Sequence, residues 1–434
     1  MGSRIRQMLG IELNNSAQAT YNPLTQTIML RRAEEPDLVK LVNAVYNPDW
    51  NAGLLLVDGA ENVLAPLVHE MRHWVDMNCS IRGLTTLQDI FQLMADPSDT
   101  NVAVKPLKRD LALSHFIERY EHADPAARYP WQVDFSLSQP NVHEPIEHIS
   151  LCFFANNDLD RRRVLFKSPV YLGSMLETCA IYQEQRDVFP LFLQPNLPRD
   201  ARENAEAAAM RLLQDPTAPE YHSISHAISI AARQHEGAHG VSLAAGLCTL
   251  LLNMPPEMLK ESCRRVEARM KNRRYGDGAV SAGRQMRAMS AVSPEAALIH
   301  NAVTELSRRS NNSGPLPYSD DLIFDLVPYW KKRQAEFFER SHLHFVAKIN
   351  AMQGPDYFHA AIPALIENNK WIMEQETLRL TLNRLPKRPP IFFGDGFVLQ
   401  GAPEFCGVEP HYLEADISLA VSALKIRALS PVPA

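Results

Sequence analysis

Two histidines four residues apart stand in residues 67–77, LVHEMRHWVDM, with a glutamate directly after the first. The stretch lies in a longer segment, residues 61–78, whose apolar positions recur at the spacing of one helical face. Side chains four apart on a helix project from the same side, so the imidazoles of His69 and His73 can hold one metal ion. The stretch therefore predicts a helix that carries a metal site.

The residue types in this stretch favour zinc and hydrolytic chemistry. Catalytic zinc sites combine imidazole and carboxylate ligands at three positions and leave the fourth for water. Glu70 stands next to the first histidine, where its carboxylate can take a proton from that water and pass it to a leaving group. We expect His69 and His73 as zinc ligands and Glu70 as the general base and acid. The alternative is a chance HExxH pattern on a core helix that binds no metal.

The residues before this helix predict a small sheet. Residues 19–32 combine a turn signal at Asn22-Pro23 with alternating apolar positions, which is typical of a strand near a sheet edge. Residues 35–47 have apolar positions at helical spacing, and residues 53–59, GLLLVDG, are typical of a buried strand that ends in a turn. The expected order is strand, helix, strand and HExxH helix.

This order over residues 19–78 resembles the N-terminal half of the zincin metallopeptidases and covers under a fifth of the chain. The resemblance implies a zinc cofactor and hydrolysis of peptide bonds in a peptide or protein substrate. The metzincin branch would need a glycine and a further histidine, but this chain has Asp76 and Cys79 after the motif. The departure points instead to a gluzincin-like arrangement, in which a glutamate from a later helix completes the ligand set.

Glu177 is the predicted third ligand. It lies in LETCA within residues 171–186, which have apolar positions at helical spacing, and Ala180 one turn later would allow close approach to the metal helix. Glu184, two turns after Glu177, is the alternative ligand. Without a metal, Glu177 would be a solvated glutamate on the helix surface.

Three more residues of the HExxH helix carry weaker expectations. Asp76 shares the metal-facing side and could accept a hydrogen bond from a ligand imidazole, or it could lie on the helix surface. Trp74 is expected to pack in the core, and Arg72 is expected to be solvated or to form a salt bridge.

A second HExxH pattern occupies residues 235–239, HEGAH. The glycines at 237 and 240 each cost about 1 kcal/mol relative to alanine inside a helix, and no strand is predicted before the pattern. The pattern could bind the metal with help from His222 or His226. A junction between two helices is the favoured interpretation.

Other polar clusters support weaker hypotheses. His143 and His148 are five residues apart with Pro145 between them, so one helical face cannot present both, although either could bind substrate near a cleft. Basic runs at residues 161–163, 264–274 and 331–333 could contact phosphates, but the acidic net charge and the lack of interleaved aromatic residues argue against nucleic-acid binding. We find no phosphate-binding loop and no GxSxG nucleophile motif in the sequence.

The composition is that of an ordinary folded protein: the 434 residues are 46% apolar and 22% charged, with a formal net charge of -6. Six cysteines without a CxxC pair fit a reducing compartment. No secretory signal and no apolar run of membrane-spanning length is visible. We therefore expect a cytoplasmic protein with no membrane partner.

The expected fold is α+β and mainly helical. Proline-rich segments and turn signals divide the chain into residues 1–195, a helical domain over residues 196–390 and a C-terminal extension over residues 391–434, with a hairpin around residues 394–396. The resemblance implies that residues 1–195 form a zincin-like metallopeptidase domain. Residues 82–169 mix short helices with proline-rich irregular segments and receive no firm assignment. The alternative function is a non-enzymatic helical interaction or sensor protein with a structural or vestigial HExxH site.

Overall fold

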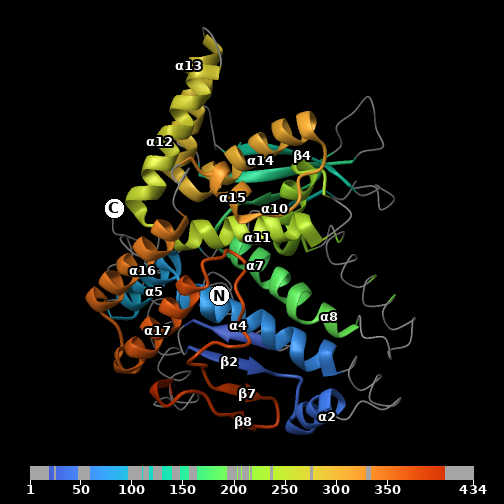
Figure 1. Cartoon of the computed structure of the whole chain (residues 1–434), viewed down its shortest axis with the longest axis vertical. Coiled ribbons are helices and arrows are strands. Elements are labelled where there is room, and N and C mark those ends of the chain that lie inside the picture. The colour runs from blue at the N-terminus through green and yellow to red at the C-terminus, as the bar shows by residue number, and fades with distance from the viewer. Residues whose placement is uncertain are drawn as a thin grey trace, which may run out of the picture.

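The computed structural model describes residues 19–23, 26–46, 59–95, 117–120, 130–138, 147–155, 164–192, 218–234, 238–273, 277–328 and 334–405, together with positions 110, 203, 207 and 215. Helices predominate, and the described strands form two small sheets in different parts of the molecule (Figure 1). The prediction of a mainly helical α+β fold is confirmed at this level.

The first sheet combines strands from both ends of the described chain. Its strands follow the order β1 (Ala19–Asn22), β2 (Thr27–Leu30), β7 (Ile391–Phe393) and β8 (Val398–Leu399). The β2–β7 pair is parallel, and the other two pairs are antiparallel. The turn signal at Asn22-Pro23 and the strand predicted from the alternating positions after it are confirmed, and residues before the turn form a further strand, β1, that was not predicted. β1 lies at the edge, whereas β2 is interior and buries Ile28 and Leu30.

The hairpin expected around residues 394–396 is present between β7 and β8. Gly396 has a φ of 89°, a conformation that glycine adopts without steric strain. Since β7 pairs with β2, residues of the predicted C-terminal extension share a sheet with residues of the predicted catalytic domain. The division into three domains stays a prediction. The strand predicted over residues 53–59 lies outside the described residues except for Gly59, which is helical.

The helices predicted over residues 35–47, 61–78 and 171–186 are all present. They are α2 (Glu35–Tyr46), the π-helical segment η1 (Ala60–Leu64) continued by α4 (Ala65–Asn78), and α7 (Leu172–Asp187). Pro66 stands in the first turn of α4, directly after η1, and has no backbone N–H to donate to the preceding turn. α5 (Ile81–Ala95) follows α4, and α8 (Phe189–Phe192) follows α7.

The second sheet occupies residues that sequence patterns left unassigned. β3 (Glu118–Arg119), β4 (Gln132–Ser138), β5 (His148–Phe154) and β6 (Val164–Pro169) form an antiparallel sheet in the order β3-β6-β5-β4. Among the described residues of 82–169, the expectation of short helices is met by the helix α5, and the strands β3 to β6 were not predicted. The strand pattern is hard to see because β5 is buried along almost all of its length and therefore does not alternate.

The second half of the described chain is a series of helices, as predicted. They are α10 (Pro219–Ala231), α11 (Ala238–Asn253), α12 (Pro256–Arg273), α13 (Asp277–Val292), α14 (Pro294–Ser313), α15 (Asp320–Leu326), α16 (Gln334–Ala351) and α17 (Asp356–Glu374), followed by a short 3₁₀ helix, η3 (Pro403–Phe405). α12 and α13 pair as a hairpin that projects from the rest of the molecule (Figure 1).

The elements are stacked in layers around α4 and α7. In Figure 1 the first sheet lies against α4, α7 lies on α4, and α10 and α11 cover α7, with the second sheet and α14 beyond them. α11 is nearly all apolar and its described interior residues are buried, as a helix surrounded on all sides requires. One large hydrophobic core runs through these layers, and two small clusters lie beside it.

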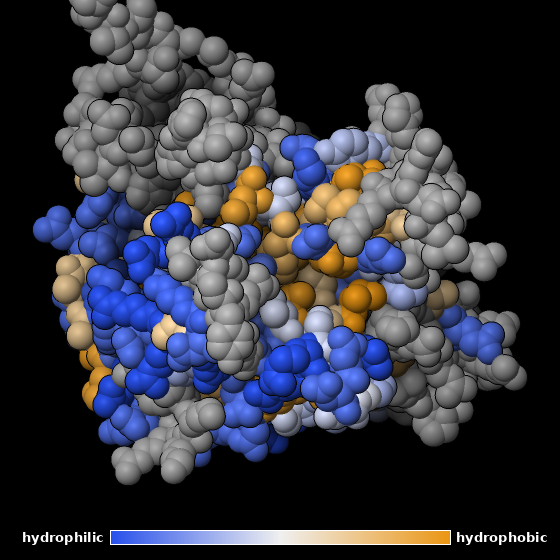
Figure 2. All heavy atoms as spheres, turned by 90° about the horizontal axis from the view of Figure 1, so that it is seen from above, coloured by the Kyte–Doolittle hydropathy of each residue, from blue (hydrophilic) through white to orange (hydrophobic). Residues whose placement is uncertain are grey.

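Figure 2 shows the described surface from the end of the molecule that carries α13. Apolar side chains gather in the middle of this face between groups of hydrophilic residues. No helix within the described residues is both long and apolar enough to span a bilayer.

Candidate metal centre

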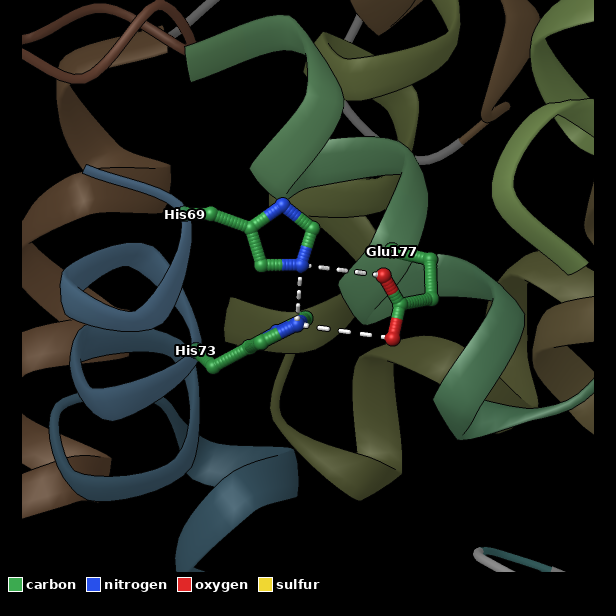
Figure 3. Close-up of side chains that lie close together, drawn as sticks. All are labelled: His69, His73 and Glu177. Carbon is green, nitrogen blue, oxygen red and sulfur yellow. Dashed lines mark hydrogen bonds and ion pairs between the residues drawn. The ribbon is translucent and has the colours of Figure 1, made fainter. Parts of the chain in front are cut away.

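The HExxH helix α4 and the glutamate helix α7 lie side by side, and each turns one face toward the other. His69 and His73 extend from α4, and Glu177 extends from α7 into the space between them (Figure 3). The Nε2 atoms of the two imidazoles are 2.9 Å apart. Glu177 Oε2 lies 3.2 Å from Nε2 of His69, and its Oε1 lies 3.4 Å from Nε2 of His73. The structure thus brings together all three residues predicted as metal ligands.

This cluster lies just below the surface. The side chains of His69 and His73 are 12% and 11% exposed, and that of Glu177 is 24% exposed. Burial disfavours the charged form of the Glu177 carboxylate, but the neighbouring His73 and His69 outweigh it and lower the pKa of Glu177 well below its usual range. Glu177 is therefore ionised beside two imidazoles, and a divalent cation bound there would replace the protons of those imidazoles.

The donor set fits zinc on chemical grounds. One donor atom from each of the three residues lies within 4.8 Å of the other two. Two imidazole nitrogens and one carboxylate are typical ligands of catalytic zinc, which leaves a further position open. Among the described residues, this is the one group of three or more histidine, cysteine, aspartate or glutamate side chains that could hold a metal ion.

Glu184 contacts the same imidazole from the opposite side. Its Oε1 lies at a short distance from Nδ1 of His69, whereas Glu177 contacts Nε2. Burial lowers the pKa of His69, but Glu184 and then Glu177 raise it more, so the pKa of His69 lies well above its usual value. Of the two glutamates considered as third ligand, Glu177 is the one that contacts both histidines. Glu184 instead holds the ring of His69 so that Nε2 faces the cluster.

Glu70, the predicted general base, lies at the border between α4 and the first sheet. Its Oε2 accepts a hydrogen bond of 2.6 Å from the backbone N–H of Tyr21 on the edge strand β1. The carboxylate is partly buried and lies next to a ligand histidine in the chain. The edge strand therefore fixes where this carboxylate points.

Tyr221, on α10, is a site residue that sequence analysis did not identify. Its ring centroid lies 6.4 Å from that of His69. The negative charge of Glu177 and then burial raise the pKa of Tyr221, with further contributions from Glu220, Glu70 and Glu184, so the phenol stays protonated. No sequence pattern links Tyr221 to the HExxH helix, because Tyr221 lies 148 residues after His73 in the chain. It reaches the site only through the packing of α10 on α7.

The structure overturns both expectations for Asp76 and confirms the salt bridge that was one of the two expectations for Arg72. Asp76 is 2% exposed and accepts a hydrogen bond of 2.8 Å from Nε of Arg72, so it neither lies on the helix surface nor serves a ligand imidazole as its partner. Arg72 is fully buried rather than solvated, and the salt bridge considered for it is present. Trp74 packs in the core as predicted and contacts Phe405 edge to face.

The second HExxH pattern falls at the connection between α10 and α11. His235, Glu236 and Gly237 lie outside the described residues, and His239 is exposed in the first turn of α11. His222 and His226, considered as helpers, are buried on α10. Their Nε2 atoms lie 2.6 Å from the carbonyl of Asp215 and 3.2 Å from that of Trp131. The expected helix junction is thus present between α10 and α11, and metal binding by the second pattern stays untested.

The remaining polar clusters are only partly described. His143 lies outside the described residues, and His148 is buried at the start of β5. Basic side chains of α12 pair with acidic ones on the same helix, as in the contacts of Arg265 with Glu261 and of Lys271 with Glu267. The basic runs at residues 161–163 and 331–333 lie outside the described residues.

Comparisons of this chain with protein-family models, with curated proteins and with solved structures found no match. The chemistry of the site is therefore argued from its geometry.

Proposed function

We propose that this protein is a zinc-dependent metallopeptidase whose active site lies between α4 and α7. The observation that carries the proposal is the convergence of Nε2 of His69, Nε2 of His73 and the carboxylate of Glu177 within 4.8 Å. Zinc bound by these residues would supply Lewis-acid activation of water and of a substrate carbonyl group. The resemblance of residues 19–78 to zincins supports the same chemistry.

Glu70 is the proposed general base and acid. Its carboxylate lies on the ligand helix directly after His69 and is oriented by the backbone N–H of Tyr21. From there it can take a proton from the attacking water and then transfer that proton to the amine of the leaving group. The carboxylate of Glu70 first gains this proton and then releases it, so Glu70 is ionised again at the end of the reaction.

Tyr221 is the proposed hydrogen-bond donor to the oxygen that gains charge during the attack. Its phenol is kept protonated by the surrounding carboxylates and by burial, so a proton is available for donation. A donor that already faces the developing charge does not have to reorient at the transition state. Tyr221 would therefore act on kcat more than on substrate affinity.

A peptide substrate fits the position of the first sheet. β1 is one of the two edge strands among the described strands of that sheet, and the backbone N–H of its Tyr21 contacts Glu70. Extended peptides bind to exposed strand edges through backbone hydrogen bonds, which carry little preference for particular side chains. We therefore propose that a peptide or protein segment lies along β1 with its scissile bond at Glu70.

The test compares zinc content and hydrolysis of a broad peptide library in the wild type and in Glu70→Gln. We expect about one zinc per chain in both proteins, and a loss of about 10²–10⁴-fold in hydrolysis in the variant, because only the proton transfer is removed. Tyr221→Phe should also keep the zinc content of the wild type and lower the turnover number, kcat. A well-folded wild type that takes up no zinc would refute the metallopeptidase. Zinc without hydrolysis of any peptide would favour the sensor or interaction protein instead.

A further inference from the structure

A buried arginine stands between the two histidines of the HExxH helix in the chain. Arg72 is completely buried, and positions 72 and 76 form a row on α4 next to the row of His69 and His73. Its Nε donates to Asp76 at 2.8 Å, one turn further along α4. The guanidinium has further donors, and both of its terminal nitrogens contact other helices.

One terminal nitrogen connects α4 to the helix that carries Glu177. It donates to Oε1 of Gln183 at 3.2 Å. The amide nitrogen of Gln183 donates to Asp187 at 2.7 Å, so the amide oxygen is the atom that faces Arg72. Gln183 is completely buried and directly precedes Glu184, the residue that contacts Nδ1 of His69. Arg72 is thus tied to α7 between the two glutamates of the site.

The other terminal nitrogen connects α4 to α11 behind the site. It donates to Oγ1 of Thr249 at 2.8 Å, and Thr249 is 2% exposed. Cys179, two residues after Glu177, also approaches Thr249, with its Sγ 3.9 Å from the hydroxyl oxygen. Three helices, α4, α7 and α11, therefore meet on one guanidinium.

Stability alone is a poor explanation of this arrangement. Taking a guanidinium and a carboxylate out of water is costly, and well-packed apolar side chains commonly replace such buried pairs without loss of stability. A guanidinium differs from an apolar side chain because its N–H donors lie in one plane and point in fixed directions. The groups that accept these hydrogen bonds are therefore held at defined orientations and distances. Ligand distances at a metal tolerate deviations of only about 0.2 Å, so helix rotation matters at this site.

We propose that Arg72 is a positioning residue that sets α7 against α4 so that Glu177 meets His69 and His73 at one metal position. The inference rests on the zinc site proposed above. Arg72 acts through Gln183 on α7 and through Thr249 on α11, and Asp76 holds its guanidinium in the required plane. Residues that orient ligands in this way typically contribute about 10–100-fold to metal affinity.

The test uses the full chain and the double variant Arg72→Met/Asp76→Leu, which removes both buried charges together. We measure the zinc dissociation constant by competition with a chelating dye, the visible absorption of bound cobalt(II), and folding by circular dichroism. Zinc should bind about 10–100-fold more weakly to the folded variant, and the cobalt spectrum should change because the ligand geometry has changed. Leu298→Ala, in the buried core of α14, is the matched control that lowers stability away from the network, and it should keep the wild-type zinc affinity.

A folded double variant with the wild-type zinc affinity and cobalt spectrum would refute the positioning role and leave the zinc site intact. If the double variant does not fold, Gln183→Met decides the question, because it removes the contact of Arg72 with α7, together with the hydrogen bond from Gln183 to Asp187, and keeps a side chain of similar size. Unchanged affinity in Gln183→Met would refute the proposal, and weaker affinity with an altered cobalt spectrum would support it. A wild type that binds neither metal would refute the zinc site and the inference together.

Discussion

The two HExxH stretches of this chain share their pattern but differ in their surroundings. Residues 69–73 lie inside one continuous helix, α4, which packs against the first sheet on one side and α7 on the other. Residues 235–239 fall where α10 has ended at Ala231 and α11 begins at Ala238. A metal site needs a continuous helix to hold two imidazoles on one face and a neighbouring element to supply a further ligand. The first stretch has both, which teaches that the pattern is informative only together with its packing.

The largest difference between the two stretches should appear in zinc content. His69→Ala removes one of the three converging donors, so we expect the purified variant to lose the zinc that the wild type holds. His235→Ala changes the second stretch and should keep the zinc of the wild type. Metal analysis of both variants, after circular dichroism has shown that each is folded, makes the comparison. Loss of zinc in His235→Ala and retention in His69→Ala would move the site to the second stretch.

An intermediate effect should follow from Glu184→Gln. The change keeps the shape of the side chain but removes the charge beside Nδ1 of His69, so the imidazole is less firmly oriented and a weaker base. Zinc should bind about 10–100-fold more weakly, as measured by competition with a chelating dye. Glu177→Gln is the matched variant, and its loss should be larger because Glu177 contacts both histidines. A larger loss in Glu184→Gln than in Glu177→Gln would make Glu184 the ligand.

The smallest expected effect is on the free energy of unfolding, and it concerns Gly240, the residue directly after the second stretch. A Cβ on Gly240 would lie 2.0 Å from Oγ and 2.6 Å from Cβ of Ser229, because α10 and α11 approach closely there. Overpacking of this kind costs about 1–3 kcal/mol, and the gain in helix propensity from glycine to alanine is about 1 kcal/mol. Gly240→Ala should therefore lower the free energy of unfolding in urea by about 1 kcal/mol and leave zinc content unchanged.

Gly283→Ala is the control for this stability measurement. A Cβ on Gly283, in α13, would meet only the flexible side chain of Lys271, which can move away. Stability should stay the same or rise slightly. A Gly240→Ala variant as stable as Gly283→Ala would show that the approach of α10 to α11 is not tight.

Local sequence patterns were sufficient for the elements that carry the ligands. The apolar periodicity of residues 61–78 and 171–186 predicted the helix made of η1 and α4, and also α7, to within one residue at their ends. The spacing of His69 and His73 then placed both imidazoles on one face, because a helix repeats its faces every three to four residues. These features depend on contacts between near neighbours in the chain, and short windows of sequence record them.

Contacts between distant parts of the chain could not be predicted in the same way. The pairing of β7 with β2 joins residues more than three hundred positions apart, and the sheet of β3 to β6 forms from strands that proline-rich segments separate. The roles of Glu184 and Tyr221 also depend on which face of one helix meets which face of another. No pattern within a single element records that choice.

The sequence by itself determined which residues we propose for metal binding and proton transfer, because imidazole, carboxylate and helical spacing are local properties of His69, Glu70 and His73. Only the tertiary structure decided which glutamate contacts both histidines, which one supports His69 from behind, and where Arg72 and Asp76 lie. The physical reason is that each of these choices depends on how the core packs α4, α7 and α11 together. That packing minimises exposed apolar surface over the whole chain rather than within any one segment.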